Sequence, residues 1–239
     1  MQKVPITVAL GFFDGFHRGH QALVREAVFR AEQNGTKTAV YTFDRYPKRT
    51  CEGYAQGAEP RHETLHGSSK ASTADAQNAA KPETKNAPEG ASEQSFEEET
   101  QRLKEIRDTK GLLQTQHQKI RRLSEEGIDY LFIQTFDETF QSLSPEDFLN
   151  YMTKALMDVQ CFLVGEDFHF GQHGAGDVHY LQDYCQRHGI QCRIIPSVNY
   201  GGAPISSSRI RQAVNVGDFP LVTQLLVRHY TLRGKVVTG

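Results

Sequence analysis

Residues 6–20 read Ile-Thr-Val-Ala-Leu-Gly-Phe-Phe-Asp-Gly-Phe-His-Arg-Gly-His, and this stretch decides the fold. The apolar run of residues 6–10 predicts a buried strand, and the glycines in the turn after it let the backbone approach a ligand closely. A helix is expected to begin directly after this turn. Because the start of a helix carries unpaired N–H groups and a partial positive charge, the arrangement suits a phosphate group.

Two histidines, His17 and His20, lie three residues apart at the predicted start of the helix. At this spacing both side chains fall on one face of the first helical turn and can reach the same phosphate. The alternative is a surface turn with two solvated histidines, but the complete run of residues 11–20 favours the phosphate site. The further phosphate-binding candidates in the turn are Gly11, Phe12, Asp14 and Gly15.

The composition argues against several classes of protein. The 239 residues suit one domain or one and a half, and a net charge of −2 does not suggest a broad basic surface for nucleic acid. No apolar run reaches about 18 residues, and the N-terminus lacks the apolar core of a signal peptide, so no membrane partner is expected. The four cysteines lack the spacing of a disulfide framework, which predicts reduced thiols and a cytoplasmic location. Cys185, His188 and Cys192 have no second ligand pair, so no metal site is predicted.

A change in composition interrupts the chain. Between residues 55 and 100 the only large aliphatic or aromatic residues are Leu65 and Phe96. Such a segment buries too little apolar area to offset the loss of chain entropy. We therefore expect a disordered insertion at about 52–105 that loops out from a single fold made by the rest of residues 1–229.

Outside the insertion, apolar runs alternate with segments of helical periodicity. Start and stop signals mark several helices, such as the cap, proline and acids of Ser144-Pro145-Glu146-Asp147 and the glycine at Gly189. The expected strands are residues 6–10, 38–43, 130–133, 161–164 and 191–195. The expected helices are residues 18–33, a pattern through Leu113, Ile120 and Leu123 ending at Gly127, and residues 144–157, 177–188, 207–215 and 219–227.

This alternation predicts an α/β fold with a doubly wound parallel sheet. In such sheets ligands bind at the carboxyl ends of the strands, near the point where the strand order reverses. The candidate motifs all follow strands or begin helices, so we expect them to meet at that edge.

A second motif, residues 164–171, reads Val-Gly-Glu-Asp-Phe-His-Phe-Gly directly after an apolar strand. Asp167 at the strand end is suited to a ribose or ribityl hydroxyl, and Phe168 and Phe170 are suited to form an apolar wall. The alternative is a glycine-bounded turn whose phenylalanines enter the core. Taken by itself, this motif favours the alternative.

A third motif, residues 205–211, reads Ile-Ser-Ser-Ser-Arg-Ile-Arg. Serines at a helix start can cap the helix and donate hydroxyls to a phosphate, and Arg209 and Arg211 add charge-assisted hydrogen bonds. The alternative is an ordinary amphipathic helix capped by Ser206 with solvated arginines. Together with the histidine pair, the phosphate interpretation is favoured.

These three segments, followed by Gly217-Asp218, Leu225-Leu226 and Arg228-His229-Tyr230, resemble the adenylyltransferase half of bacterial bifunctional riboflavin kinase/FAD synthetases. The resemblance covers the chain outside the insertion, in order. The His-x-Gly-His run indicates only the wider nucleotidylyltransferase superfamily, whereas the third motif and the segments after it are more specific. The resemblance implies a Rossmann-like fold.

The resemblance also implies a reaction in which FMN and MgATP give FAD and pyrophosphate by in-line attack of the FMN phosphate on the α-phosphorus of ATP. A phosphate nucleophile needs no general base at neutral pH, so catalysis would rest on positioning and charge neutralisation. Mg²⁺ would be held largely by phosphate oxygens and water. His17 and His20 are implied to contact the triphosphate and the α-phosphoryl transition state, and Ser207, Ser208, Arg209 and Arg211 the β- and γ-phosphates.

The resemblance implies less about the part of the site that binds FMN. Asp167 is implied to face ribose or ribityl hydroxyls, with Phe168, Phe170 and Tyr46 as flavin-binding candidates. The role of Asp14 is open, and bracing the turn is one interpretation of it.

The chain departs from the family pattern in several places. Tyr46 replaces a histidine near the site, because Phe43-Asp-Arg-Tyr-Pro47 stands where the family has Phe-x-Pro-His-Pro. His169 stands where an arginine is common, and the insertion falls in a loop that the family keeps short. Residues 230–239 resemble only the first strand of the family's riboflavin kinase barrel, so riboflavin phosphorylation is not expected from this chain.

Two other functions stay open at this point. One is a nucleotidylyltransferase of the same superfamily that acts on a different phosphorylated acceptor. The other is a nucleotide-binding regulator in which the altered loop around Tyr46 has abolished turnover.

Overall fold

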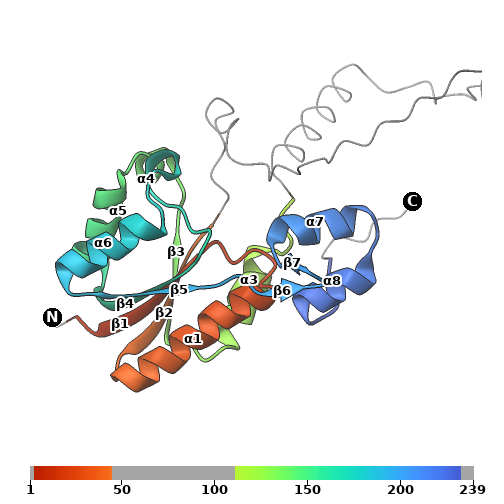
Figure 1. Ribbon diagram of the computed structural model, residues 1–239, viewed down its shortest axis with the longest axis horizontal. Helices are drawn as coiled ribbons and strands as arrows, with labels where there is room; N and C mark the ends of the chain where they lie inside the picture. Colours follow the sequence, from red (N-terminus) through yellow and green to blue (C-terminus); the bar gives the residue numbers. More distant parts are fainter. Residues whose placement is uncertain (1–2, 45–110, 233–239) are drawn as a thin grey trace, which may run out of the picture. The chain divides into compact units, whose positions relative to one another are not determined.

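Five parallel strands form the central sheet of the computed structural model, which describes residues 3–44 and 111–232 (Figure 1). The strand order is β3-β2-β1-β4-β5, and β1 pairs in parallel with both β2 and β4. The strands are β1 (Pro5–Leu10), β2 (Lys37–Phe43), β3 (Tyr130–Gln134), β4 (Asp158–Gly165) and β5 (Gln191–Ile195).

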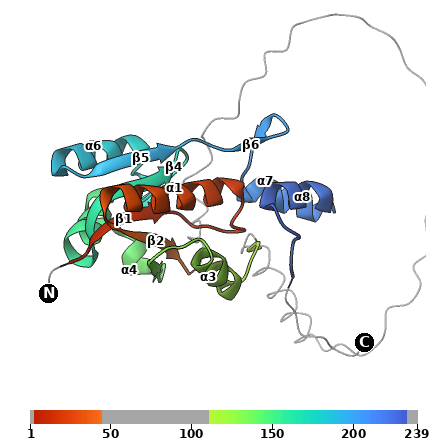
Figure 2. The ribbon, with the colours of Figure 1, turned by 90° about the horizontal axis from the view of Figure 1, so that it is seen from below.

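The helices connect these strands and extend beyond the last one (Figures 1 and 2). A short hairpin, β6 (Asn199–Tyr200) with β7 (Ala203–Pro204), follows β5. The helices are α1 (Arg18–Asn34), α3 (Gln116–Ser124), α4 (Glu138–Gln141), α5 (Pro145–Asn150), α6 (Val178–His188), α7 (Ser207–Asn215) and α8 (Phe219–Leu226).

The two faces of the sheet bury separate hydrophobic clusters, because successive side chains of a strand point to opposite faces. On β1, Val8 and Leu10 pack on the side covered by α5 and α6, and Ala9 packs on the side covered by α1 and α3. Strand β1 is almost fully buried, as expected for the centre of a sheet that is covered on both faces. The doubly wound α/β fold is confirmed.

A third hydrophobic cluster joins α7 and α8 to the rest of the protein. It contains Ile210 of α7 and Leu225 of α8, and it also includes Leu113 from the segment before α3. Figure 2 shows α7 and α8 together beyond the sheet, beside the start of α1. This packing brings the third motif close to the turn that follows β1.

Most of the predicted elements are confirmed to within a few residues, and the differences have local causes. Leu113 lies before α3 rather than in it, because α3 begins at Gln116 behind a capping box formed by Thr115 and Gln118. The helix expected over residues 144–157 ends at Asn150 and continues as a π-helical turn, Tyr151–Leu156. Within that turn the Thr153 hydroxyl donates to the carbonyl of Leu149, a contact that tends to bend helices.

Three further elements were not predicted: α4, the β6–β7 hairpin and a 3₁₀ turn at Gln172–Gly174. The helix, the 3₁₀ turn and each strand of the hairpin are four residues or shorter, too short to show a periodic pattern. The expected insertion and Tyr46 lie outside the described residues. Of residues 230–239, the first three are described and form no strand in the described part of the chain.

Candidate active site

The turn between β1 and α1 lies at the carboxyl edge of the sheet, where the strand order changes direction. Strand β1 is followed in sequence by β2 on one side, whereas β4 pairs on its other side. The first motif leaves β1 and the second leaves β4, so both lie at this edge of the sheet. This edge is where doubly wound folds bind their ligands.

The turn has an unusual backbone conformation. Phe13 has a φ of 55° and Phe16 a φ of 40°, and Gly15 between them has a φ of 75°. The left-handed region is costly for bulky residues and persists only where the surroundings impose it. Both phenylalanine side chains are buried in the cluster beneath α1, which supplies part of that constraint.

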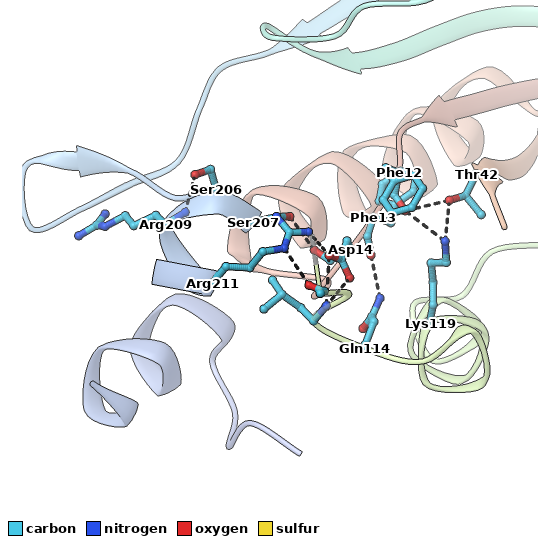
Figure 3. A network of polar contacts seen from close by, with 12 residues as sticks. Phe12, Phe13, Asp14, Thr42, Gln114, Lys119, Ser206, Ser207, Arg209 and Arg211 are labelled. Carbon is cyan, nitrogen blue, oxygen red and sulfur yellow. Dashed lines mark hydrogen bonds and ion pairs between the residues drawn. The ribbon is translucent and has the colours of Figure 1, made fainter. Parts of the chain in front are cut away.

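Side chains from distant elements hold the carbonyl oxygens of this turn (Figure 3). The donors come from β2, from α3 and the segment before it, from the start of α7 and from Arg228, which follows shortly after α8. The contacts are Thr42 and Lys119 to Phe12 O, Gln114 to Phe13 O, Ser207 to Asp14 O, and Arg228 to Gly15 O and Phe16 O.

The carboxylate of Asp14 anchors the turn from within. It is 2% exposed, accepts the backbone N–H of Leu113 at 3.0 Å and forms an ion pair with Arg211. Burial raises the pKa of this carboxyl, while the Leu113 N–H and Arg211 act to lower it. Arg211 also donates to the carbonyl of Gly111 at 2.9 Å. The interpretation that Asp14 braces the turn is supported.

His17 and His20 are brought together as the spacing predicts. Their rings stack with centroids 3.7 Å apart, and His17 caps α1 by accepting the backbone N–H of His20 at its Nδ1. Because Nδ1 of His17 acts as an acceptor, the neutral ring carries its proton on Nε2. The Nδ1 atom of His20 is buried and has no hydrogen-bond partner within the described part of the chain.

Both histidines are neutral at physiological pH. Burial, with a smaller contribution from the charge of Arg228, lowers the pKa of His17 to about 4. Burial, followed by the charges of His17 and Lys119, lowers the pKa of His20 well below its ordinary range. The pair therefore offers an anion hydrogen bonds rather than positive charge, until a bound anion raises these pKa values.

The side chains of the third motif contact different parts of the structure. Ser206 caps α7, as its sequence position predicts, while Ser207 and Arg211 face the turn after β1. Arg209 points away from Asp14 in Figure 3, and its guanidinium donates to three carbonyls of the β6–β7 hairpin. Ser208 is exposed on the first turn of α7. Of the four predicted phosphate ligands, two therefore shape the turn.

The second motif lies beside the first but keeps one member in the core. Phe170 is buried and packs against Phe148 and Tyr180. Phe168 is half-buried and stacks on Phe170, while Asp167 is exposed at the end of β4. The core interpretation therefore holds for Phe170, and Asp167 and Phe168 are the members that a ligand can reach.

Sequence reasoning missed Lys119, Gln114 and Arg228 as parts of this site. Lys119 is 4% exposed and lies four residues before the buried Leu123 on the inner face of α3. A lysine at a core position of an amphipathic helix is a signal that could have been used, because lysines are rarely buried without a partner. Gln114 carries no comparable local signal, whereas Arg228 stands in one of the segments that support the family resemblance.

The described residues contain no group of three or more His, Cys, Asp or Glu side chains placed to hold a metal ion. None of the helices in residues 3–44 and 111–232 combines the length and apolar character that crossing a membrane requires.

The Asp14–Arg211 pair generates a prediction about stability. Arg211→Met is expected to lower the free energy of unfolding by about 3 kcal/mol, because a buried carboxylate loses its cation. Adding Asp14→Asn should recover part of that loss. Urea denaturation of the wild type, both single variants and the double variant measures the coupling.

Arg25→Met is the matched control for these denaturation experiments. Its ion pair with Glu126 involves an arginine side chain that is 65% exposed, so the expected change is below about 1 kcal/mol. Strictly additive effects of Asp14→Asn and Arg211→Met would contradict the anchoring role of the pair.

The depressed pKa of His17 generates a second prediction. Between pH 6.5 and about 4 the unfolded chain protonates this histidine while the folded protein does not, so the free energy of unfolding falls as the pH drops through that range. His17→Asn keeps a good N-cap but cannot titrate. The wild type should therefore lose up to about 3 kcal/mol more than the variant over this interval. If the free energies of unfolding of the wild type and of His17→Asn changed equally with pH, His17 would not be neutral in the folded protein.

Comparisons with known proteins show the family of this chain. The FAD synthetase family model matches residues 1–70 and 78–209. A bifunctional riboflavin kinase/FMN adenylyltransferase of Listeria monocytogenes is 27% identical over 97% of this chain and 57% of its own length. The corresponding protein of Bacillus subtilis is 26% identical over 100% of this chain and 58% of its own length. The chain thus spans a little over half the length of these relatives.

Two further comparisons are informative. A putative bifunctional riboflavin kinase/FMN adenylyltransferase of Geobacillus thermodenitrificans is 26% identical over 92% of this chain and 88% of its own length. A crystal structure described as a macrolide-efflux protein from Streptococcus pneumoniae superposes with a TM-score of 0.64 at 24% identity, over 95% of this chain and 56% of that one. This structure supports the fold. With the family match covering most of its length, the chain belongs to the FAD synthetase family.

Proposed function

We propose that this chain is an FMN adenylyltransferase, which forms FAD and pyrophosphate from FMN and MgATP. The observation that supports it best is the stacked pair of neutral histidines at the start of α1, in a member of the FAD synthetase family. An oxygen of the FMN phosphate attacks the α-phosphorus of ATP, and the bond from that phosphorus to the pyrophosphate oxygen breaks. The nucleophile is already ionised, so no side chain has to accept a proton.

The start of α1 supports the reacting phosphate. Its first N–H groups and its partial positive charge favour an anion, and Nε2–H of His17 donates to an oxygen of the α-phosphoryl group. His20 has a buried Nδ1 without a partner in the described residues, which leaves this ring able to take a proton as negative charge builds up beside it. These interactions strengthen as charge develops in the transition state.

The pyrophosphate side of the site uses the start of α7. Ser208 and the first N–H groups of this helix are the proposed contacts for the β- and γ-phosphates, while Ser207 and Arg211 keep the turn in place. A contact between Arg209 and the triphosphate requires its guanidinium to leave the carbonyls of Tyr200, Ala203 and Pro204.

Mg²⁺ is proposed to enter as part of MgATP, held by phosphate oxygens and water. The carboxylate in the same turn as the histidines, that of Asp14, is already engaged by Arg211 and the Leu113 N–H. The donor set therefore suits an ion that arrives with its own phosphate ligands. Asp167 and Phe168 are the proposed contacts for the ribityl chain and flavin, and Tyr46 remains a candidate outside the described residues.

A cytoplasmic location is proposed with this function. ATP and FMN are cytoplasmic substrates, and Cys161, Cys185 and Cys192 are free thiols. No nucleic-acid or membrane partner is part of the proposal.

The direct test is to incubate the protein with FMN and MgATP and to separate the flavins by chromatography while measuring pyrophosphate. Equal amounts of FAD and pyrophosphate are expected. Turnover with another phosphorylated acceptor but not with FMN would assign a different reaction, and ATP binding without turnover would indicate a regulator.

The histidines provide the residue-level prediction. His17→Asn and His20→Asn are each expected to lower kcat for FAD formation by about 10²-fold, the magnitude typical of a lost electrostatic contact in a transition state. His188→Asn is the control, since His188 stacks on Tyr184 and bonds to its carbonyl at the end of α6. A near-normal kcat in either of the first two variants, measured by steady-state kinetics, would remove that residue from the mechanism.

A further inference from the structure

Lys119 occupies an unusual position at the carboxyl edge of the sheet. It reaches from α3 to the point where β1 and β2 end, and its side chain is almost fully buried (Figure 3). Its Nζ donates to the carbonyl of Phe43 at 2.7 Å, to the carbonyl of Phe12 at 3.3 Å and to the hydroxyl of Thr42 at 3.3 Å. The ammonium thus joins the ends of two adjacent strands.

The hydrogen-bond acceptors around Lys119 match the donors of an ammonium group. An ammonium has three N–H donors, and the three acceptors just described match them one to one. The ammonium also lies 4.6 Å from the centre of the Phe12 ring, a distance typical of a cation–π contact. A neutral amine has only two N–H groups, so it could not donate to all three oxygens as the ammonium does.

The charge of Lys119 acts on the turn that carries the histidines. Asp14 in that turn and Asp44 after β2 attract the ammonium, and the ammonium in turn lowers the pKa of His20. The Phe12 carbonyl that Lys119 holds is two residues from Asp14, the anchor of the turn. Lys119 is therefore linked to the reacting end of α1 by both contact and charge.

We propose that Lys119 is a positioning residue for adenylyl transfer. In its protonated form it fixes the Phe12 carbonyl against the end of β2, and it thereby sets the position of the turn that presents His17 and His20 to the α-phosphate. This inference rests on the proposed formation of FAD from FMN and MgATP.

A pH dependence follows from this role. Burial lowers the pKa of Lys119 to about 8, against the opposing attraction of Asp14 and Asp44. The ammonium form, and with it kcat, is expected to decline as the pH rises above that value. The last ionisation of a phosphate group has a pKa of about 6, so the phosphates of both substrates are almost fully ionised above pH 8.

The test compares kcat profiles for FAD formation from about pH 7 to about pH 10. The wild type should decline with an apparent pKa near 8, whereas Lys119→Arg, whose guanidinium stays charged, should lack this decline when scaled to its own maximum. Lys119→Met should lower kcat by about 10- to 100-fold at pH 7, the effect of a small displacement of reacting groups. Lys37→Met, which removes an exposed lysine paired with Asp129, is the matched control and should retain the wild-type profile.

Stability separates positioning from a merely structural role. The unfolded chain holds the Lys119 proton up to its ordinary pKa of 10.5, so between about pH 8 and 10.5 the unfolded state binds more protons than the folded state. The free energy of unfolding of the wild type should therefore rise with pH relative to that of Lys119→Met, while kcat falls. If stability decided the rate, the two quantities would move together.

The outcomes are distinct. Absence of FAD formation by the wild type would overturn the proposed function and this inference with it. A wild-type enzyme that makes FAD but shows a flat profile, or a Lys119→Arg variant that keeps the same decline, would overturn the inference alone. A wild-type kcat in folded Lys119→Met would do the same. Cys192→Ser tests whether the decline comes instead from the Cys192 thiol, whose pKa is lowered. Loss of the decline in kcat in that variant would overturn the assignment of the decline to Lys119.

Discussion

The ion pair between Asp14 and Arg211 is the constraint on which the rest of this site depends. It joins a buried carboxylate in the turn after β1 to an arginine on α7, almost two hundred residues later in the chain. A buried pair of this kind contributes little net stability, because both charges lose their hydration, but removing one partner is costly. Its effect is to specify how the last two helices sit against the sheet, together with the apolar cluster that contains Leu113.

Burial and hydrogen bonds explain why the same turn adopts a conformation that bulky residues avoid. The left-handed backbone at Phe13 and Phe16 is stabilised by burial of both rings and by donors that engage each carbonyl from residue 12 to residue 16. With those oxygens engaged, the start of α1 remains as a source of partial positive charge at the edge of the sheet. The strain is thus part of how the site is held ready for a phosphate.

Neutral histidines fit this arrangement better than charged ones. Burial lowers the pKa values of His17 and His20, and the nearby cations Arg228 and Lys119 lower them further, so both rings are unprotonated in the absence of a ligand. A triphosphate would reverse that balance locally, because an adjacent anion favours the protonated ring. The site can therefore respond to charge that appears only when substrate is bound, which is where electrostatic stabilisation accelerates a reaction.

Local signals were sufficient for most of the fold. The unbroken apolar runs fixed the strands, and caps such as Ser144, Asp177 and Ser206 located helix starts to within a residue. α4 and the β6–β7 hairpin were missed because they are too short to show a periodic pattern, and the π-helical turn was missed because the Thr153 hydroxyl contacts both the Leu149 carbonyl and the distant Tyr184. Propensity and periodicity carry no information about such contacts.

By itself, the sequence determined the doubly wound sheet, the histidine pair at the start of α1 and the family to which the chain belongs. The sheet and the histidine pair follow from hydrophobic periodicity, capping and residue spacing, all of which act between near neighbours along the chain. The family follows instead from the resemblance of the three motifs and the segments after them to FAD synthetases. Only the tertiary structure decided the partners of the third motif: Ser207 and Arg211 hold the turn, whereas Arg209 holds the hairpin. It also decided the burial of Lys119, because the direction of a long, charged side chain depends on which acceptors the folded chain brings within its reach.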